Sequence, residues 1–291
     1  MGIEALKTIG VLGAGQMGGG IAQVVAQGGR RVLLADLDLA RAERGRDLVA
    51  KGLAKLVEKG KLDAPSRDAA LARIVPVAGM EAFAEADFAI EAATENLELK
   101  RKLMRGLDQA CREGVTIASN TSSISITLLA AETSRPQHVV GMHFMNPVPV
   151  MKLVEVVRHP GSDPAAVALA VALADKLGKT PIVVADAPGF ASSRLGLALG
   201  LEAMRMVEQG VASAADIDTA MKLGYGHPMG PLELTDLVGL DVRLGIADYL
   251  TSAIGPAFAP PEILRAKVAD GKLGKKSGEG FYTWTADGKK R

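Results

Sequence analysis

His143 and Glu155 are the residues of this chain whose types and positions best suit proton transfer. Histidine changes its protonation state near neutral pH, so it is the usual acid or base where a reaction moves a proton. His143 follows the apolar run 139–142 and precedes the segment 146–149 (NPVP), which must end a strand and turn the chain. We therefore expect His143 at the carboxyl end of a strand, where ligands bind in open α/β sheets. The other histidines have ordinary turn or solvent roles in this interpretation: His138, His159 and His227.

Glu155 lies in the strand-like run 152–157, where an unpaired carboxylate is costly to bury. It therefore needs a partner. If the turn 146–149 brings this run back beside the preceding one, His143 and Glu155 face each other. A carboxylate in that position fixes the tautomer of the imidazole and stabilises the imidazolium that forms on proton uptake. The alternative is that Glu155 faces solvent on an edge strand.

A hydroxyl-rich turn, 119–123 (SNTSS), follows the apolar run 116–118. Such turns often cap the next helix, and Ser123 or Ser125 can do so here. The turn also follows the carboxyl end of a predicted strand, so one of its hydroxyls can instead hold a substrate oxygen.

The segment 7–36 has the pattern strand, glycine turn, helix, strand and acid. Gly13 permits the tight turn, Gly15 lets the backbone approach a pyrophosphate, and Gly18 lets the helix pack close to the strand. The helix N-terminus favours the phosphates through its free N–H groups and its dipole. Asp36 can accept hydrogen bonds from an adenosine ribose and disfavours a 2′-phosphate, which predicts NAD as the cofactor. The expected contacts in this loop are Gly13, Gly15, Gln16, Met17 and Gly18.

Alternating apolar and helical segments position these residues. Strands are predicted at 74–77, 88–90, 116–118, 139–142 and 182–184, all of them buried, and helices at 39–59, 97–110 and 164–177. This alternation after a glycine loop predicts an α/β fold with a doubly wound, mostly parallel Rossmann-type sheet. Strand signals nearly vanish after residue 186, so we expect an NAD-binding domain at 1–186 and an all-helical domain at 187–291. The apolar helices of the second domain are a natural surface for a homodimer.

Composition excludes several classes of protein. The formal charge of the 291 residues is +1, which gives no field to attract nucleic acid or an anionic membrane. No signal peptide or long apolar segment is visible, and the single cysteine, Cys111, indicates a reducing compartment. We therefore expect a cytoplasmic protein whose partners are small molecules and other subunits, with no metal site.

Seven motifs, in order along almost the whole chain, resemble the L-3-hydroxyacyl-CoA dehydrogenase family, especially its short-chain 3-hydroxybutyryl-CoA members. They are GAGQMG, EAATENLELK, SNTSS, GMHFMNPVPVMKLVEV, DAPGF with Arg194, HPMGPLELTDLVGLD and GKKSGEGFY. The resemblance implies that His143 is the catalytic acid/base and Glu155 its paired carboxylate. It also implies that Ser122 donates to the 3-oxygen of the substrate and lies next to the nicotinamide.

Further site residues follow from the same resemblance. Those that match contacts to the dinucleotide are Glu95, Lys100, Asn146 and Lys276. Lys59 matches a lysine that contacts coenzyme A. It shares a helix face with Lys51 and Lys55, and from spacing alone this face is either an anion site or a solvated surface. One position departs from the family: Ser193 stands where many members have a substrate-orienting asparagine, and its shorter reach leaves the acyl preference open.

The sequence thus predicts an enzyme that interconverts 3-hydroxyacyl-CoA and 3-oxoacyl-CoA with NAD, in fatty-acid or butanoate metabolism. One alternative is a relative that acts on a free hydroxy acid, such as a sugar acid or carnitine. Another is a non-catalytic dinucleotide-binding subunit, which would have no need of a buried proton-transfer pair. A third, a reductase with a catalytic lysine in the helical domain, is disfavoured because the predicted helix 192–209 contains no lysine.

Overall fold

The computed structural model describes residues 2–291. The chain divides into two compact units, of which one extends to Phe190 and the other covers Ala191–Arg291. The last strand of the first unit ends at Ala185, next to the predicted domain boundary at residue 186. Each unit is described by itself.

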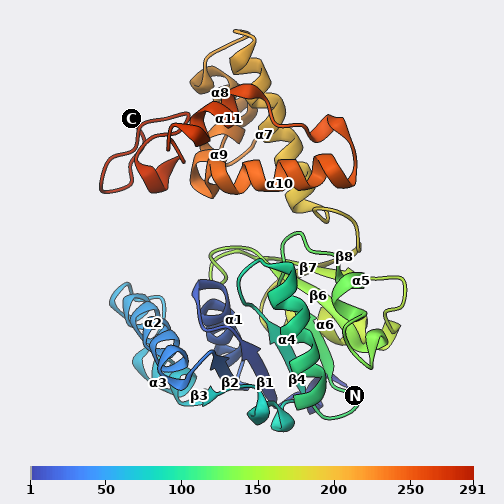
Figure 1. Ribbon diagram of the computed structural model, residues 1–291. Coiled ribbons are helices and arrows are strands. Elements are labelled where there is room, and N and C mark those ends of the chain that lie inside the picture. Colours follow the sequence, from blue (N-terminus) through green and yellow to red (C-terminus); the bar gives the residue numbers. More distant parts are fainter. Residues whose placement is uncertain (1) are drawn as a thin grey trace. The chain divides into compact units, whose positions relative to one another are not determined.

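The first unit is built on one sheet of eight strands in the order β3-β2-β1-β4-β5-β6-β7-β8 (Figure 1). All neighbouring strands are parallel except β6 and β7, which are antiparallel. The strands are β1 (Thr8–Leu12), β2 (Arg31–Asp36), β3 (Ile74–Ala78), β4 (Phe88–Glu91), β5 (Thr116–Ser119), β6 (Val139–Phe144), β7 (Leu153–Arg158) and β8 (Thr180–Ala185). The predicted doubly wound sheet is therefore confirmed, and the apolar runs of the sequence are its strands.

Helices form an apolar core on each face of this sheet. One core includes side chains of α1, α2, α3 and α6, and the other includes side chains of α4 and α5. The helices are α1 (Gln16–Gln27), α2 (Leu39–Glu58), α3 (Ala64–Arg73), α4 (Leu97–Ala110), α5 (Ile126–Ala130) and α6 (Pro164–Lys176). Ser125 caps α5 through the N–H of Leu128, which is one of the two capping residues that the sequence suggested. Because the helices shield both faces, the site has to form at the strand ends.

The prediction of a buried strand at 182–184 is wrong in one respect. The strand exists as β8, but it lies at the edge of the sheet and pairs only with β7. Ile182 is 38% exposed and Val183 is 49% exposed. An apolar run shows that a strand is favoured, but only the order of the strands decides which one lies at an edge.

The second unit is helical: α7 (Ser192–Glu208), α8 (Ala214–Tyr225), α9 (Pro231–Val238), α10 (Leu240–Ala253) and α11 (Glu262–Ala269). Ser213 accepts the N–H of Asp216 at the start of α8, so the predicted cap is confirmed. Pro231 opens α9, as its fixed φ favours. Within residues 2–291 no helix combines the length and apolar character that a membrane span requires.

Two buried aspartates organise the last motifs of the chain. Asp218 accepts the N–H groups of Leu232 and Glu233, so α8 caps the start of α9. Asp236 accepts backbone N–H groups of the C-terminal segment and the indole N–H of Trp284 at 2.8 Å. Both carboxylates are at most 1% exposed, so these donors compensate charges that would otherwise be costly to bury.

Candidate active site

β6 and β7 bring His143 and Glu155 together. Their antiparallel register places His143 directly opposite Glu155. Nδ1 of His143 lies 2.7 Å from Oε2 of Glu155, whose side chain is fully buried. With Nδ1–H donated to the carboxylate, Nε2 is the ring nitrogen whose lone pair can take up a proton. The predicted pairing of the two side chains is confirmed, and the alternative of a solvent-facing Glu155 is wrong.

Phe190 packs beside the imidazole, which the sequence reasoning missed. The two ring centroids are 5.9 Å apart and the ring planes are tilted by 55°. Phe190 has a φ of 47°, the one positive φ of a residue other than glycine in the part of the chain described. A left-handed backbone costs such a residue about 1–2 kcal/mol, so the fold holds this ring against His143 at a cost. The sequence does contain one indication of this packing, because an aromatic residue directly follows the Pro188-Gly189 turn.

Glycine is required at Gly13 and Gly18 for a different reason than at Gly15. A Cβ at Gly18 would lie 1.7 Å from the carbonyl oxygen of Gly13, and Gly13 itself has a φ of 103°. Both are therefore required by the protein's own packing. A Cβ at Gly15 would meet no protein atom within 4 Å, and no side chain caps the start of α1. The open space at Gly15 and the uncapped helix N-terminus suit a pyrophosphate, as the residues of an NAD site should.

Asp36 ends β2 beside this loop. Its Oδ2 accepts the N–H of Ala14 at 2.7 Å, and its Oδ1 accepts the N–H of Leu37 at 2.8 Å. These bonds fix the carboxylate where β2 ends. Each oxygen keeps acceptor capacity for a hydroxyl of a ribose.

Gln16 connects the glycine loop to the turn after β6. Its side-chain amide donates to Oδ1 of Asn146 at 3.0 Å. A pocket of about 340 Å³ lies here, and its lining includes Gly15, Gln16, Asn146 and Pro147. Gly15 and Gln16 are thus in the same pocket as Asn146, a predicted cofactor contact that lies far from them in the sequence. A second pocket, of about 440 Å³ between α6 and β8, contains none of the predicted site residues.

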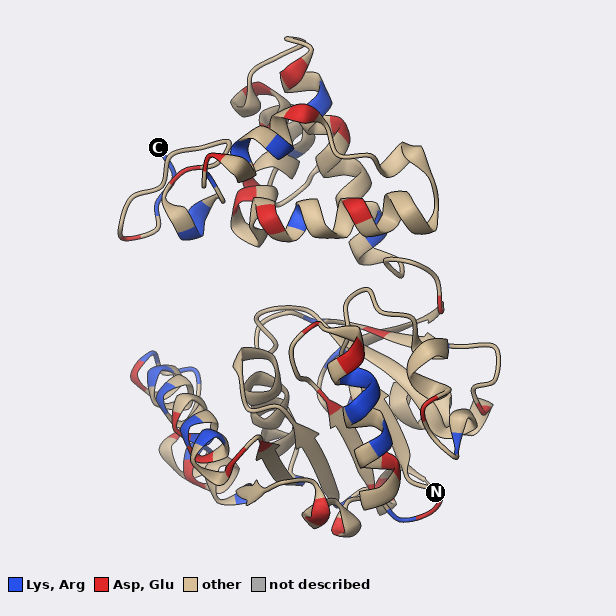
Figure 2. Ribbon diagram, viewed as in Figure 1, with Lys and Arg blue, Asp and Glu red and all other residues tan. Residues whose placement is uncertain are grey.

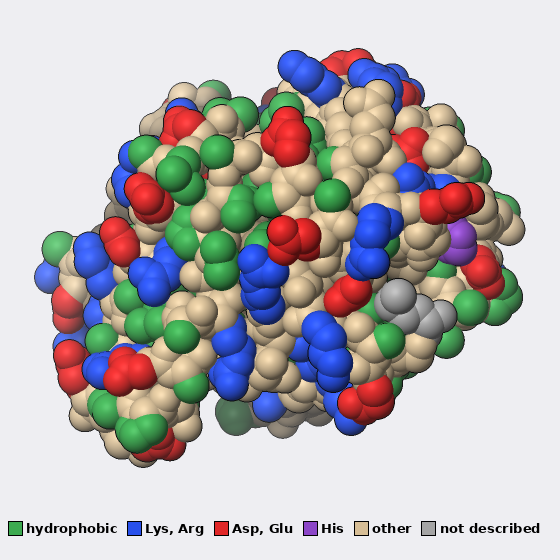
Figure 3. Space-filling view, turned by 90° about the horizontal axis from the view of Figure 1, so that it is seen from below, with side chains coloured by type: hydrophobic (Ala, Val, Ile, Leu, Met, Phe, Trp, Pro, Cys, Tyr) green, Lys and Arg blue, Asp and Glu red, His purple; other side chains and the backbone are tan. Residues whose placement is uncertain are grey.

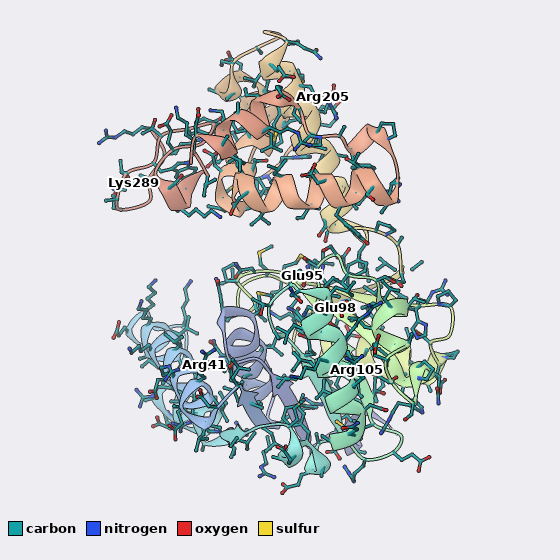
Figure 4. The ribbon with its side chains drawn as sticks, in the orientation of Figure 1. Arg41, Glu95, Glu98, Arg105, Arg205 and Lys289 are labelled. Carbon is teal, nitrogen blue, oxygen red and sulfur yellow. The ribbon has the colours of Figure 1, made fainter. Side chains whose placement is uncertain are left out.

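Glu95 holds the hydroxyl-rich turn after β5. Its Oε1 accepts hydrogen bonds from the side chain of Thr121 at 2.6 Å and from the backbone N–H of Ser122 at 3.0 Å, and Ser123 donates to the same oxygen. Burial by itself would raise the pKa of Glu95, but these donors and the charge of Lys100 outweigh it and lower the pKa below its usual value. Figure 4 shows Glu95 near the N-terminal end of α4. A carboxylate therefore orients Ser122, a link that the sequence did not indicate.

Lys100 points into the protein. Its ammonium is 2.7 and 2.8 Å from the two carboxylate oxygens of Glu91 and 3.8 Å from Glu95. Glu91 also accepts the hydroxyl of Ser119 at 2.6 Å. Lys100 is 1% exposed, so the predicted contact with the dinucleotide would require this ammonium to leave Glu91. The structure places Lys100 as a support for two carboxylates, that of Glu91 at the end of β4 and that of Glu95 in the segment that follows. The prediction from sequence did not include Glu91.

Lys59 follows the last turn of α2, a helix whose ribbon is coloured blue at several Lys and Arg positions in Figure 2. Lys51, Lys55 and Lys59 are exposed, and none forms an ion pair with another described residue. On the face seen from below in Figure 3, basic and acidic side chains are interspersed. The lysines of α2 are therefore available to an anionic ligand, but a solvated surface would look the same.

Ser193 and Lys276 belong to the helical unit. Ser193 lies in the first turn of α7 and is partly exposed. Lys276 donates to Oδ2 of Asp241 at 2.6 Å, in the first turn of α10. Burial raises the pKa of Asp241, but the Lys276 hydrogen bond and the backbone of Val242 outweigh it, so the pKa lies below its usual value. Among residues 2–291 no three metal-binding side chains gather at one place.

Comparison with known proteins matches both units to one family. Residues 8–187 match the NAD-binding domain of 3-hydroxyacyl-CoA dehydrogenase, and residues 189–284 match its C-terminal domain. A probable 3-hydroxybutyryl-CoA dehydrogenase of Deinococcus radiodurans is 47% identical over 94% of this chain and 99% of the relative. A 3-hydroxyadipyl-CoA dehydrogenase of Escherichia coli is 42% identical over 97% of this chain and 60% of the relative.

Comparison with solved structures supports the same family. The crystal structure of (S)-3-hydroxybutyryl-CoA dehydrogenase from Ralstonia eutropha superposes with a TM-score of 0.94 at 43% identity, over 97% of this chain and all of the other. The resemblance that the motifs carried is therefore confirmed at the level of the family, its NAD-binding domain and its fold. This chain belongs to the 3-hydroxyacyl-CoA dehydrogenase family.

Proposed function

We propose that this protein is an NAD-dependent dehydrogenase that interconverts (S)-3-hydroxyacyl-CoA and 3-oxoacyl-CoA, with 3-hydroxybutyryl-CoA as a substrate. The observation that carries the proposal is the 2.7 Å contact between His143 and the fully buried Glu155. A binding-only protein gains nothing from such a pair, because a buried carboxylate beside an imidazole is useful where the imidazole gains and loses a proton.

His143 handles the proton of the substrate hydroxyl. In the oxidative direction Nε2 of His143 accepts that proton, and the carboxylate of Glu155 stabilises the resulting imidazolium. In the reductive direction the same imidazolium returns the proton to the 3-oxygen. NAD, bound along the glycine loop, supplies the hydride acceptor or donor. The backbone N–H of Ser122 is held by Glu95, and in this proposal its hydroxyl hydrogen turns from Glu95 to the 3-oxygen when substrate binds, where it keeps the carbon–oxygen bond polarised.

The remaining predicted contacts are part of this proposal. Asp36 binds the adenosine ribose, Asn146 and Lys276 contact the dinucleotide, and Lys59 binds coenzyme A. Ser193 orients the substrate in place of the asparagine that many family members have. The exposed position of Lys59 and the pocket beside Asn146 support these assignments.

We further propose a homodimer formed through the helical unit. Its support is a set of exposed apolar side chains on α7, α9 and α10, among them Leu195 (66% exposed), Leu199, Leu237 and Val242. Surface leucines of this kind favour association with an apolar partner surface. A cytoplasmic location and a role in fatty-acid or butanoate metabolism complete the proposal, supported by the single cysteine being a buried free thiol.

The test follows NADH oxidation with acetoacetyl-CoA, with free acetoacetate, and with NADPH in place of NADH. We expect turnover with acetoacetyl-CoA and NADH. His143→Gln should lower kcat by roughly a hundredfold or more, the scale of a lost general acid, and leave the Kd for NADH nearly unchanged.

His138→Gln is the matched control, because His138 precedes β6 at the opposite end from His143. Near-normal turnover of the His143 variant would remove His143 from the mechanism. Activity with acetoacetate but none with acetoacetyl-CoA would favour a dehydrogenase of free hydroxy acids. Binding of NADH without turnover of either substrate would favour the non-catalytic subunit.

A further inference from the structure

Lys179 is a buried lysine that the proposed reaction does not use. It lies between the end of α6 at Lys176 and the start of β8 at Thr180, and it is only 7% exposed. Its backbone N–H donates to the carbonyl of Ala174 at 3.1 Å, and the N–H of Thr180 donates to the carbonyl of Lys152 at 2.7 Å. The backbone from which this side chain extends is therefore fixed by α6 and by the residue that precedes β7.

The ammonium of Lys179 donates to two carbonyl groups of one turn. Nζ lies 2.9 Å from the carbonyl oxygen of Met151, and it also donates to the carbonyl oxygen of Val148. Burial and the nearby charge of Lys152 lower the pKa of Lys179, and no acid among residues 2–291 opposes them. A buried ammonium is unfavourable unless hydrogen bonds compensate it, and these two carbonyl groups provide that compensation.

The turn that receives these bonds, residues 147–151, directly follows Asn146. Backbone hydrogen bonds to the carbonyl of Pro147 close the turn. Val148 is 2% exposed and packs against α1, where a Cβ at Gly20 would lie 2.9 Å from the Cβ of Val148. The helix and the buried ammonium therefore hold the turn at the same residue, one through its side chain and the other through its carbonyl.

Asn146 is in this way brought to the glycine loop. Its Oδ1 accepts the side-chain amide of Gln16 at 3.0 Å, and both residues line the pocket of about 340 Å³ beside Gly15. We propose that Lys179 is a positioning residue of the cofactor site, which holds the turn 147–151 so that Asn146 is placed for its contact with the dinucleotide. This inference rests on the proposed function, in which Asn146 makes that contact.

The expected consequence concerns cofactor binding more than the chemical step. A turn that is already in place does not have to be ordered when the ligand binds, and such pre-organisation increases affinity. Lys179→Met keeps most of the apolar length of the side chain and removes both hydrogen bonds. We expect the Kd for NADH, measured by fluorescence without thioester, to rise by about 10-fold, the scale of a lost hydrogen bond to a charged group. At saturating NADH, kcat and the KM for acetoacetyl-CoA should stay within about twofold of wild type.

A double-mutant cycle with Asn146→Ala separates positioning from general stabilisation. If Lys179 acts through Asn146, the double variant should bind NADH about as weakly as Asn146→Ala alone, because the side chain that Lys179 places is then absent. A lysine that only stabilised the fold would instead give effects on Kd that multiply.

Lys176→Met is the matched control. Lys176 ends α6, its side chain is 52% exposed, and it pairs with Glu4 at 3.0 Å. This variant should bind NADH like the wild type, since it removes the same charge from a solvated place. Lys179→Gln should lie between the wild type and Lys179→Met, because its amide keeps a donor for the carbonyl groups. It takes the place of Lys179→Met in the cycle if that variant does not fold.

Unchanged NADH affinity in a folded Lys179→Met variant, or in Lys179→Gln where it replaces it, would overturn the inference. Effects that multiply in the double variant would overturn it as well, and so would an Asn146→Ala variant that binds NADH like the wild type. Failure of the wild-type protein to oxidise NADH with acetoacetyl-CoA would refute the proposed function, and the comparison of Kd values would still decide on Lys179.

Discussion

The substitution Glu155→Gln tests whether the negative charge of Glu155 contributes to proton transfer by His143. Glutamine has nearly the size of glutamate, and its side-chain carbonyl can still accept Nδ1–H of His143. The geometry is therefore retained, while the negative charge 2.7 Å from the imidazole is lost. Because Glu155 is fully buried and His143 is 8% exposed, solvent and salt screen their interaction little.

The size of the effect follows from that contact. A hydrogen bond to a charged group contributes about 1.5–3 kcal/mol, and about 1.4 kcal/mol corresponds to a tenfold change in rate. The imidazolium forms as the reaction proceeds, so the loss affects the transition state more than the bound substrate. We expect kcat for acetoacetyl-CoA reduction to fall by about 10- to 100-fold, with little change in KM.

The assay measures initial rates of NADH oxidation and the Kd for NADH by fluorescence. Glu85→Gln is the control, because the carboxylate of Glu85 lies on the surface and pairs with Arg31. A folded Glu155→Gln variant whose kcat stays within about twofold of wild type would refute the argument that this charge stabilises the imidazolium.

Three further predictions concern the cofactor side of the site. Gly18→Ala should lower the melting temperature, because its Cβ would lie 1.7 Å from a carbonyl oxygen and overpacking costs about 1–3 kcal/mol. Gly15→Ala should melt like the wild type but bind NADH about tenfold more weakly, since its methyl group occupies the space of the pyrophosphate; unchanged NADH affinity would show that Gly15 does not face the cofactor. Glu95, whose pKa is lowered in the folded protein from its ordinary 4.5, should stabilise the turn fully above that pH and lose this contribution as the pH falls through the lowered pKa. The difference in melting temperature between wild type and Glu95→Gln should therefore be constant above about pH 5 and shrink below it, and a difference independent of pH down to the acid transition would contradict this role.

The sequence by itself determined the parts of the fold and site that depend on local pattern. The glycine loop between β1 and α1 requires glycine for steric reasons that operate within a few residues, and the apolar runs are strands because they favour burial in a parallel sheet. The position of His143 at a strand end followed from the prolines that come after it. Pairing with Glu155 also followed, because an apolar strand cannot leave a carboxylate without a partner.

Only the tertiary structure decided the features that depend on which elements become neighbours. The exposure of β8 results from its place at the sheet edge, and nothing within its own apolar run specifies that place. The resemblance predicts that Lys100 contacts the dinucleotide, but β4 places Glu91 where its carboxylate accepts hydrogen bonds from the ammonium. Phe190 is a comparable case, since its packing against the ring of His143 depends on a residue of another element. Burial, charge compensation and close packing are properties of the assembled chain, so local sequence cannot specify them.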